Sequence, residues 1–136
     1  MATVKHIAIR NSNYNATTDY LTMQHNEFTN KPILGPDGEM IPRDFYLIGG
    51  INCDPYSFDD ECKATNAFFG RNSSFNEIKA HHYIVSFDPE DVRDNGLTPE
   101  KAQVLGMELA EKAFPGHQTI ICTHKDGHDG AGNIHC

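Results

Sequence analysis

The sequence lacks any long hydrophobic run. Its first residues, MATVKHIAIRN, are interrupted by Lys5, His6 and Arg10, and polar sequence follows them. A signal peptide needs an apolar core of about 7–15 residues, and a membrane-spanning helix needs about 20. We therefore expect no signal peptide, no membrane span and no membrane partner, and we expect a cytoplasmic protein.

The sequence also lacks closely paired cysteines. Cys53, Cys62, Cys122 and Cys136 are scattered, and none forms a C-x-x-C pair. A zinc ribbon needs such pairs, and a small disulfide-built fold needs a denser cysteine framework. Buried or incidental thiols are the expected state of all four.

Basic residues are few. The chain has 11 Lys and Arg against 19 Asp and Glu, for a formal net charge of −8. Phosphate binding draws on clustered Lys and Arg, so a general nucleic-acid coat is excluded. Any binding to DNA must be local or use basic surface elsewhere, and Lys5, Arg10 and Arg43 are the candidate phosphate contacts by charge.

Internal repeats and low-complexity segments are also absent. The chain has 136 residues, of which 38% are hydrophobic, and it includes eight Phe and five Tyr. This composition is typical of a folded protein, and the length suits one core. We expect a single domain over residues 1–136.

Strand and helix patterns alternate along the chain. An α+β fold is therefore predicted, with an antiparallel or mixed central sheet and helices packed on it. The expected strands cover residues 3–10, 44–51, 79–87 and 118–124, with a further strand beginning at Ile134. The expected helices follow Asn13 (about 14–24), Ser57 (to Gly70) and Thr98 (to Pro115), each of these three residues being an N-cap candidate.

Two helices show apolar spacing that predicts their buried faces. The stripe of the second helix is Phe58, Cys62, Thr65 and Phe69, and that of the third is Ala102, Leu105, Leu109 and Ala113. The region of residues 25–43 instead contains three prolines and two glycines. Because it is too interrupted for a regular element, we interpret it as a long loop of the kind that often forms lids or binding sites.

Histidines flank a Gly- and Asp-rich connection near the end of the chain. His124 ends one predicted strand and His135 lies in the next, so an antiparallel pairing can bring the two imidazoles together. A third ligand two residues after His135 would share its face of the strand, and Asp126 could orient a ligand as a hydrogen-bond acceptor. The alternative is a solvated hairpin with no metal.

Adjacent histidines also occur in the third predicted strand. His81 and His82 project to opposite faces, so at most one can face a given site, and His82 is the candidate. Ordinary packing or exposure to solvent is the alternative for His82.

The segment T-H-x-D-G-H-x-x-x-G-N-I-H-C, residues 123–136, resembles the third motif of the relaxase, or mobilisation nuclease, family of HUH endonucleases. Five other segments agree in order and spacing with relaxases of mobile elements in low-GC Gram-positive bacteria. They are A-x-x-D-Y-L-T (16–22), G-I-N-C (50–53), H-H-Y-I-V-S-F-D-P (81–89), G-L-T-P-E-K-A-Q (96–103) and F-P-G-H-Q (114–118).

The resemblance implies a nicking and strand-transfer enzyme. In that family a tyrosine attacks a phosphate of single-stranded DNA at the origin of transfer, leaving a 5′ phosphotyrosyl link and a free 3′ hydroxyl. The matching position is Tyr20, with Tyr14 and His25 as alternative nucleophiles, and a core role is the alternative for Tyr20 itself. His124 and His135 would hold a divalent metal, Mg²⁺ or Mn²⁺, and the partners would be accessory relaxosome proteins and a coupling protein in a bacterial cytoplasm.

One departure from the family pattern affects activity. The motif normally ends in a second histidine, which would be residue 137, so two of three imidazoles and an incomplete last strand are expected in this chain. We therefore expect the 136 residues alone to nick DNA poorly. Two further functions stay open: a rolling-circle replication initiator or transposase of the same chemistry, and a non-catalytic DNA-binding or regulatory module.

Overall fold

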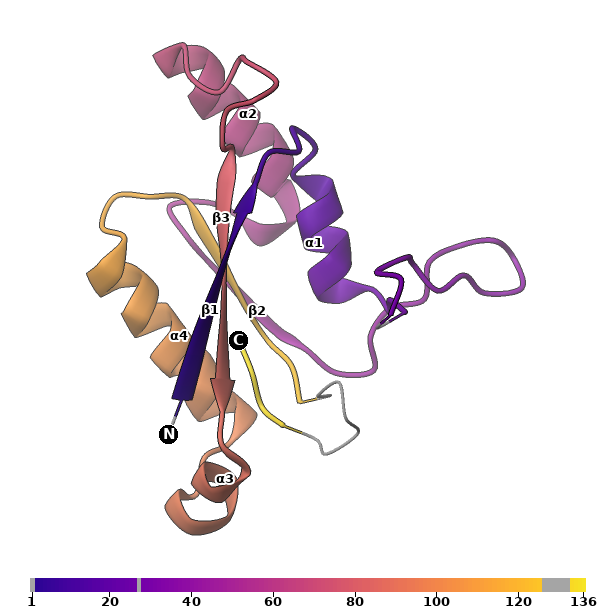
Figure 1. Ribbon diagram of the computed structural model, residues 1–136, viewed down its shortest axis with the longest axis vertical. Helices are drawn as coiled ribbons and strands as arrows, with labels where there is room; N and C mark the ends of the chain where they lie inside the picture. The colour runs from indigo at the N-terminus through magenta and orange to yellow at the C-terminus, as the bar shows by residue number, and fades with distance from the viewer. Residues whose placement is uncertain (1, 27, 126–132) are drawn as a thin grey trace.

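A computed structural model describes residues 2–26, 28–125 and 133–136, and it has the predicted α+β fold (Figure 1). Strands and helices alternate, as the sequence pattern predicted. The elements in chain order are β1 (Ala2–Ile9), α1 (Asn15–Thr22), β2 (Leu47–Ile51), the 3₁₀ turn η1 (Pro55–Ser57), α2 (Phe58–Phe69), β3 (Ala80–Phe87), α3 (Pro89–Asn95), α4 (Pro99–Ala113) and β4 (Thr119–Thr123).

The strands form two antiparallel pairs that the last residues of the chain connect. β1 pairs with β3 from Ala2↔Phe87 to Ile9↔Ala80, and β2 pairs with β4 from Leu47↔Thr123 to Ile51↔Thr119. The segment of residues 133–136 lies between the pairs, because His135 bridges both Ser86 and His124. The spatial order is therefore β1, β3, residues 133–136, β4, β2, with antiparallel neighbours throughout.

Helix α4 packs against β2 and β4 through its smallest residues. Ala102, Gly106 and Ala110 are buried, and this spacing of four lets the helix lie close to the sheet. Gln103 fixes the contact: its Nε2 donates to the backbone oxygen of Ile121 at 3.0 Å, and its Oε1 accepts from Thr123 Oγ1 at 2.7 Å. None of the described helices is long and apolar enough to cross a membrane.

The predicted stripe of α4 is wrong beyond Ala102. Leu105 and Leu109 are 46% and 43% exposed, and Ala113 is exposed as well. The helix rests on β2 and β4 with its small residues, which turns the two leucines toward the space beside β3. Leu109 there lines a cavity between β3 and β4.

Helices α1 and α2 cover the other side of the strands (Figure 1). Tyr14, Phe58 and Cys62 form a buried cluster, with the rings of Tyr14 and Phe58 edge to face at 5.8 Å. The predicted α2 stripe fails at its end, since Phe69 is 67% exposed. The last turns of α2 extend past the start of β3, where no strand covers them (Figure 1).

The predicted helix caps have mixed outcomes. Thr98 caps α4 as expected, accepting from Lys101 N, whereas Ser57 holds the N-cap position of α2 without a side-chain capping bond. For α1 the N-cap is Tyr14 rather than Asn13, whose side chain accepts from Asn15 N. The unpredicted helix α3 is capped by Asp88, whose side chain accepts from Glu90 N, and it is too short to show a helical apolar period.

The region of residues 25–43 forms an arm beside α1, with no helix or strand among its described residues (Figure 1). Isolated bridges hold it as an irregular hairpin, pairing Met23 with Pro42, His25 with Pro32, and Leu34 with Met40. The sequence predicted this long irregular loop correctly.

The chain that follows β2 turns back close to Gly50, and a substitution at this glycine tests that close approach. A Cβ at Gly50 would lie 2.2 Å from the backbone oxygen of Cys53 and 3.0 Å from Pro55 Cδ, so the backbone would have to move. We expect Gly50→Ala to lower the free energy of unfolding by about 3 kcal/mol, measured by urea denaturation.

Gly49→Ala is the matched control for this prediction. Its Cβ would lie 3.2 Å from Met107 Sδ and 3.3 Å from Gln103 Nε2, so each side chain would have to move by only a few tenths of an ångström and no backbone atom is in the way. We expect a loss below about 1 kcal/mol. Equal losses at the two positions would refute the close backbone approach at Gly50.

Candidate active site

Tyr20 lies on the last turns of α1, surrounded by two histidines and an arginine. Its ring centroid is 5.3 Å from that of His25 and 6.2 Å from that of His82. The side chain is half-buried rather than enclosed in the core. The structure thus brings together three of the residues that the sequence selected, from α1, the arm and β3.

Arg43 adds a positive charge at Tyr20. Its Cζ lies 6.0 Å from the Tyr20 ring centroid, and its Nη2 donates to the backbone oxygen of Tyr20 at 3.0 Å. Its backbone N also donates to Thr22 O at 2.9 Å, which fixes the end of the arm against α1. Sequence reasoning selected Arg43 by charge alone and did not predict its contact with Tyr20.

His124 and His135 form the predicted pair. Their backbones exchange two hydrogen bonds, at 2.8 and 3.0 Å, and His124 Nδ1 faces His135 Nε2 at 3.2 Å. His124 is 3% exposed, and His135 is half-buried. The antiparallel pairing expected from the sequence is therefore present.

The outer nitrogens of this pair face backbone carbonyl oxygens. His124 Nε2 lies 2.6 Å from the backbone oxygen of Leu21, and His135 Nδ1 lies 3.4 Å from that of Asn133. The inner nitrogens, His124 Nδ1 and His135 Nε2, are within hydrogen-bonding distance of each other at 3.2 Å.

This geometry fits a metal cation. Two imidazole nitrogens on one cation, each at about 2.1 Å and at an angle near 100°, would lie about 3.2 Å apart. The described parts of the chain contain no cluster of three His, Cys, Asp or Glu side chains suited to a metal. The two imidazoles could supply two ligands of such a cation, and Asp126, the predicted orienting residue, lies outside the described residues.

Leu21 connects Tyr20 to the histidine pair. Its backbone oxygen receives His124 Nε2–H at 2.6 Å and the Cys122 thiol at 3.7 Å. Because Leu21 follows Tyr20 directly, the tyrosine and the imidazole pair are parts of one region. The sequence could not indicate this contact, since any residue type supplies a backbone oxygen.

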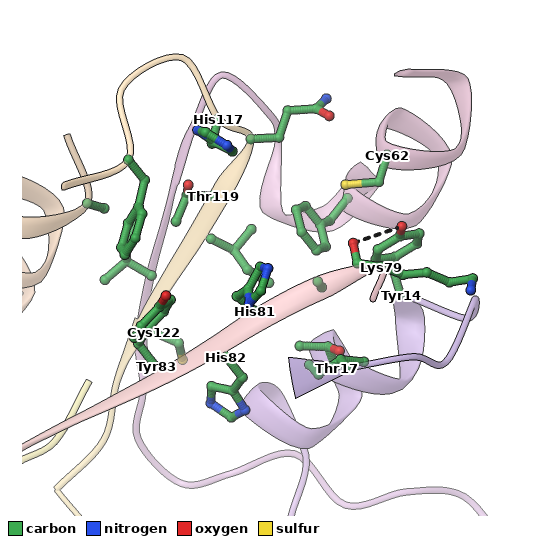
Figure 2. A pocket seen from close by; sticks show the side chains of 18 of the residues that line it. Tyr14, Thr17, Cys62, Lys79, His81, His82, Tyr83, His117, Thr119 and Cys122 are labelled. Atoms are coloured by element: carbon green, nitrogen blue, oxygen red, sulfur yellow. Dashed lines mark hydrogen bonds between the residues drawn. The ribbon is translucent and has the colours of Figure 1, made fainter. Parts of the chain in front are cut away.

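His82 faces this region, and His81 does not. Figure 2 shows the two side chains on opposite sides of β3. Burial lowers the pKa of His82, so its imidazole is neutral at pH 7. His81 lies on the far side with His6, their Nδ1 and Nε2 atoms 2.9 Å apart.

Tyr14 has the surroundings of a core tyrosine. It is 3% exposed, and its hydroxyl donates to the backbone oxygen of Lys79 at 3.3 Å (Figure 2). The same hydroxyl accepts from Asn66 Nδ2 at 2.9 Å. Burial raises the pKa of Tyr14, against an opposing hydrogen bond from Asn66. A higher pKa makes the phenolate less available, so this geometry favours Tyr20 over Tyr14 as a nucleophile.

Two further candidate residues, His25 and Arg10, each have a side-chain hydrogen bond to a backbone oxygen. His25 contacts the Tyr20 ring and its Nδ1 donates to Met23 O at 3.0 Å, which leaves Nε2 as the basic nitrogen. Arg10 donates to the backbone oxygen of Asn76 at 3.3 Å, next to the loop before β3.

An α+β fold with a helix-borne tyrosine beside paired histidines agrees with the class of protein that the motifs resemble. The model of the relaxase family described as MobA/VirD2-like, nuclease domain, matches residues 41–136, and the chain belongs to this family. Similar proteins include three called Protein rlx, all from Staphylococcus aureus. They are 42%, 41% and 35% identical to this chain over 77, 76 and 77 residues.

These matches cover 57%, 56% and 57% of this chain but only 22%, 21% and 22% of the relatives. The chain thus spans about a fifth of their length. No solved structure matches it.

Tyr14 at the N-cap of α1 and Tyr20 within the helix should differ in their effect on stability. Tyr14→Phe removes the hydroxyl that Asn66 and the Lys79 carbonyl share, and we expect it to lower the free energy of unfolding by about 1–2 kcal/mol. Tyr20→Phe removes a hydroxyl from a half-buried ring and should change it by less than about 0.5 kcal/mol. Urea denaturation of both variants measures the difference, and a larger loss at Tyr20 would show that Tyr20 is the structural tyrosine.

Proposed function

We propose that residues 1–136 belong to the catalytic domain of a relaxase that nicks single-stranded DNA at an origin of transfer. It would serve the conjugative mobilisation of a plasmid or transposon in a bacterial cytoplasm. Accessory relaxosome proteins and a coupling protein would be its partners. One observation carries the proposal: His124 Nε2 of the imidazole pair lies 2.6 Å from the backbone oxygen of Leu21, the residue that follows Tyr20.

Tyr20 is the proposed nucleophile. Its Oη–P bond forms while the P–O3′ bond breaks, leaving a 5′ phosphotyrosyl link and a 3′ hydroxyl after the leaving oxygen takes a proton. A phenol with a pKa near 10 is a weak nucleophile at neutral pH, so it needs a base or a nearby cation. The neutral imidazole of His82 and the basic nitrogen of His25 are the candidate acceptors for the phenol proton.

The chain has a net charge of −8, but Arg43 places a positive charge near Tyr20. The Arg43 guanidinium can face a phosphate at the Tyr20 ring, where charge is needed, without a basic surface elsewhere. A Mg²⁺ or Mn²⁺ ion held by His124 Nδ1 and His135 Nε2 would neutralise charge on the scissile phosphate.

The nucleophile is tested with a covalent adduct. Single-stranded oligonucleotides tiling the mobilisation region of the element are incubated with a chain of the relatives' length and Mn²⁺, and the SDS-resistant protein–DNA product is measured. We expect Tyr20→Phe to abolish this adduct and to retain DNA binding. Tyr14→Phe, once shown to be folded, should retain the adduct.

Other outcomes identify the alternatives. An adduct that survives Tyr20→Phe but disappears with His25→Gln would make His25 the nucleophile. DNA binding that resists chelators, with no adduct in any variant, would identify a non-catalytic DNA-binding or regulatory module. An adduct only on replication-origin DNA would indicate a rolling-circle initiator or transposase.

Metal binding is tested separately from activity. We expect the 136-residue chain to bind Mn²⁺ in a calorimetric titration, and His124→Ala or His135→Ala to weaken binding about tenfold or more, because each removes one of two imidazoles. His81→Ala is the control, since it breaks the other imidazole pair on the far side of β3. Loss of binding in His81→Ala alone would place the metal on that other face.

A further inference from the structure

Three of the eight phenylalanines are exposed at one end of the molecule. Phe68 and Phe69 end helix α2 and are 83% and 67% exposed, and Phe75, in the loop that leads to β3, is 90% exposed. Figure 1 shows the last turn of α2 and this loop at the end of the molecule opposite α3. Single exposed apolar residues are ordinary, but grouped ones are typical of a binding surface. We call these three residues the aromatic patch.

Hydrogen bonds fix the loop that carries Phe75. Lys79 Nζ donates to the backbone oxygen of Ser74 at 2.7 Å, and Arg10 Nε donates to that of Asn76 at 3.3 Å. The residues directly before and after Phe75 are therefore both held by cationic side chains. A ligand that stacks on this ring needs to order little of the loop, which favours its binding.

Basic residues collect in this part of the chain, although the chain is acidic overall. Residues 1–18 and 62–87, which include β1, most of α2 and β3, contain five of the 11 basic residues and one of the 19 acidic residues. The five are Lys5, Arg10, Lys63, Arg71 and Lys79, and the acidic one is Glu77. The rest of the chain has six basic and 18 acidic residues. The net charge of −8 therefore conceals a segregation of charge.

Three of these cations lie beside the aromatic patch. Arg10 and Lys79 contact the loop backbone, and the exposed Arg71 follows Phe69 by two residues, where the C-terminus of α2 favours a cation. The acidic first turn of α2, residues 59–61, lies about 10 Å or more back along the helix at about 1.5 Å per residue. Salt at about 0.1 M largely screens charges over that distance, so the patch is locally positive.

Exposed rings among fixed cations suit a single strand of nucleic acid. Unpaired bases stack on aromatic side chains, and the phosphates between them bind Lys and Arg. A duplex offers the same phosphates but keeps its bases stacked on one another. A second copy of the chain would also cover the rings, but it would bring like charges together. The positive charge therefore favours a single-stranded polyanion as the occupant.

We propose that the aromatic patch, together with Arg10, Arg71 and Lys79, is a second contact surface for single-stranded DNA. It is separate from the Tyr20 site, because Tyr20 lies on the last turns of α1 beside the arm, whereas the patch lies beyond the first turn of this helix (Figure 1). Binding there uses base stacking and phosphate charge, and it needs neither a metal nor a particular base sequence. This inference rests on the proposed function, since it concerns the same class of substrate.

Stacking is tested at Phe75 with the 136-residue chain. Binding of a fluorescein-labelled oligothymidylate of about 20 nucleotides is measured by anisotropy in EDTA, so neither a metal nor cleavage contributes. We expect Phe75→Leu, which stays apolar but loses the aromatic ring, to weaken binding about fivefold or more. Phe75→Tyr keeps the ring and should bind within about twofold of the unaltered chain. Because Phe75 is 90% exposed, neither change should move the urea midpoint of unfolding.

The charge is tested by the salt dependence of the same binding. Each phosphate contact on a single strand contributes about 0.7 to the slope of log K against log salt concentration. We expect Arg71→Gln to reduce the size of this slope by about that amount. Arg93→Gln is the matched control and should leave the slope unchanged, since Arg93 lies on α3 at the other end of the molecule, paired with Glu90 and Asp94.

Several results would overturn the proposal. They are no binding by the unaltered chain, unchanged affinity in Phe75→Leu, equal weakening in Phe75→Tyr, and an unchanged slope in Arg71→Gln. A loss of duplex binding in Phe75→Leu as large as the loss of strand binding would also overturn it, because the ring would then not stack on unpaired bases. A dimer in sedimentation that Phe75→Leu dissociates would assign the patch to a second copy.

Failure of this proposal can be distinguished from failure of the proposed function. The adduct is measured with Mn²⁺ and depends on Tyr20, whereas strand binding is measured in EDTA and should be unchanged in Tyr20→Phe. An adduct that Tyr20→Phe abolishes, with full strand binding in Phe75→Leu, would support the nicking function and refute the second surface. Weakened strand binding in Phe75→Leu without any adduct would do the reverse.

Discussion

The backbone pairing of His135 is the contact on which both the sheet and the site depend. Two-stranded sheets are marginal alone, and His135 joins two of them by bridging Ser86 and His124. The same residue carries one of the two imidazoles that face each other at 3.2 Å. Binding of a cation between them would therefore add to the free energy that holds the two halves of the sheet together.

Charge in this molecule is used locally. A chain with net charge −8 repels nucleic acid at long range. At an ionic strength of about 0.1 M, salt largely screens this repulsion beyond about 10 Å. Near Tyr20 the balance differs, because the Arg43 guanidinium lies against the ring and the neighbouring His82 is held neutral by burial. A negative net charge and a locally positive surface at Tyr20 can thus coexist in this chain.

The strand pattern and the histidine pairing could be predicted from the sequence, because both follow from local periodicity and from one antiparallel turn. His82 could be assigned to a face of its strand but not to a neighbour. Two contacts around Tyr20 could not be predicted. Leu21 contacts His124 through its backbone oxygen, and Arg43, at the end of the long arm of residues 25–43, donates to the backbone oxygen of Tyr20. Neither contact has a sequence signature.

The sequence also predicted the wrong buried face for α4. Periodicity selects the most apolar face of a helix, which includes Leu105 and Leu109, whereas close packing on a sheet selects the face with the smallest side chains. Ala102, Gly106 and Ala110 therefore lie against β2 and β4. Only the neighbouring strands determine which face is buried.

Helix α1 explains why two tyrosines six residues apart have different surroundings. At 100° per residue they point about 120° apart, so Tyr14 enters the core while Tyr20 faces the arm and β3. Asp59 Oδ1 accepts from Tyr14 N at 2.7 Å, and at the other end Leu21 O accepts from His124. A short helix has little stability of its own, so these two anchors position Tyr20. The buried Tyr14 thereby helps to fix the helix that carries Tyr20.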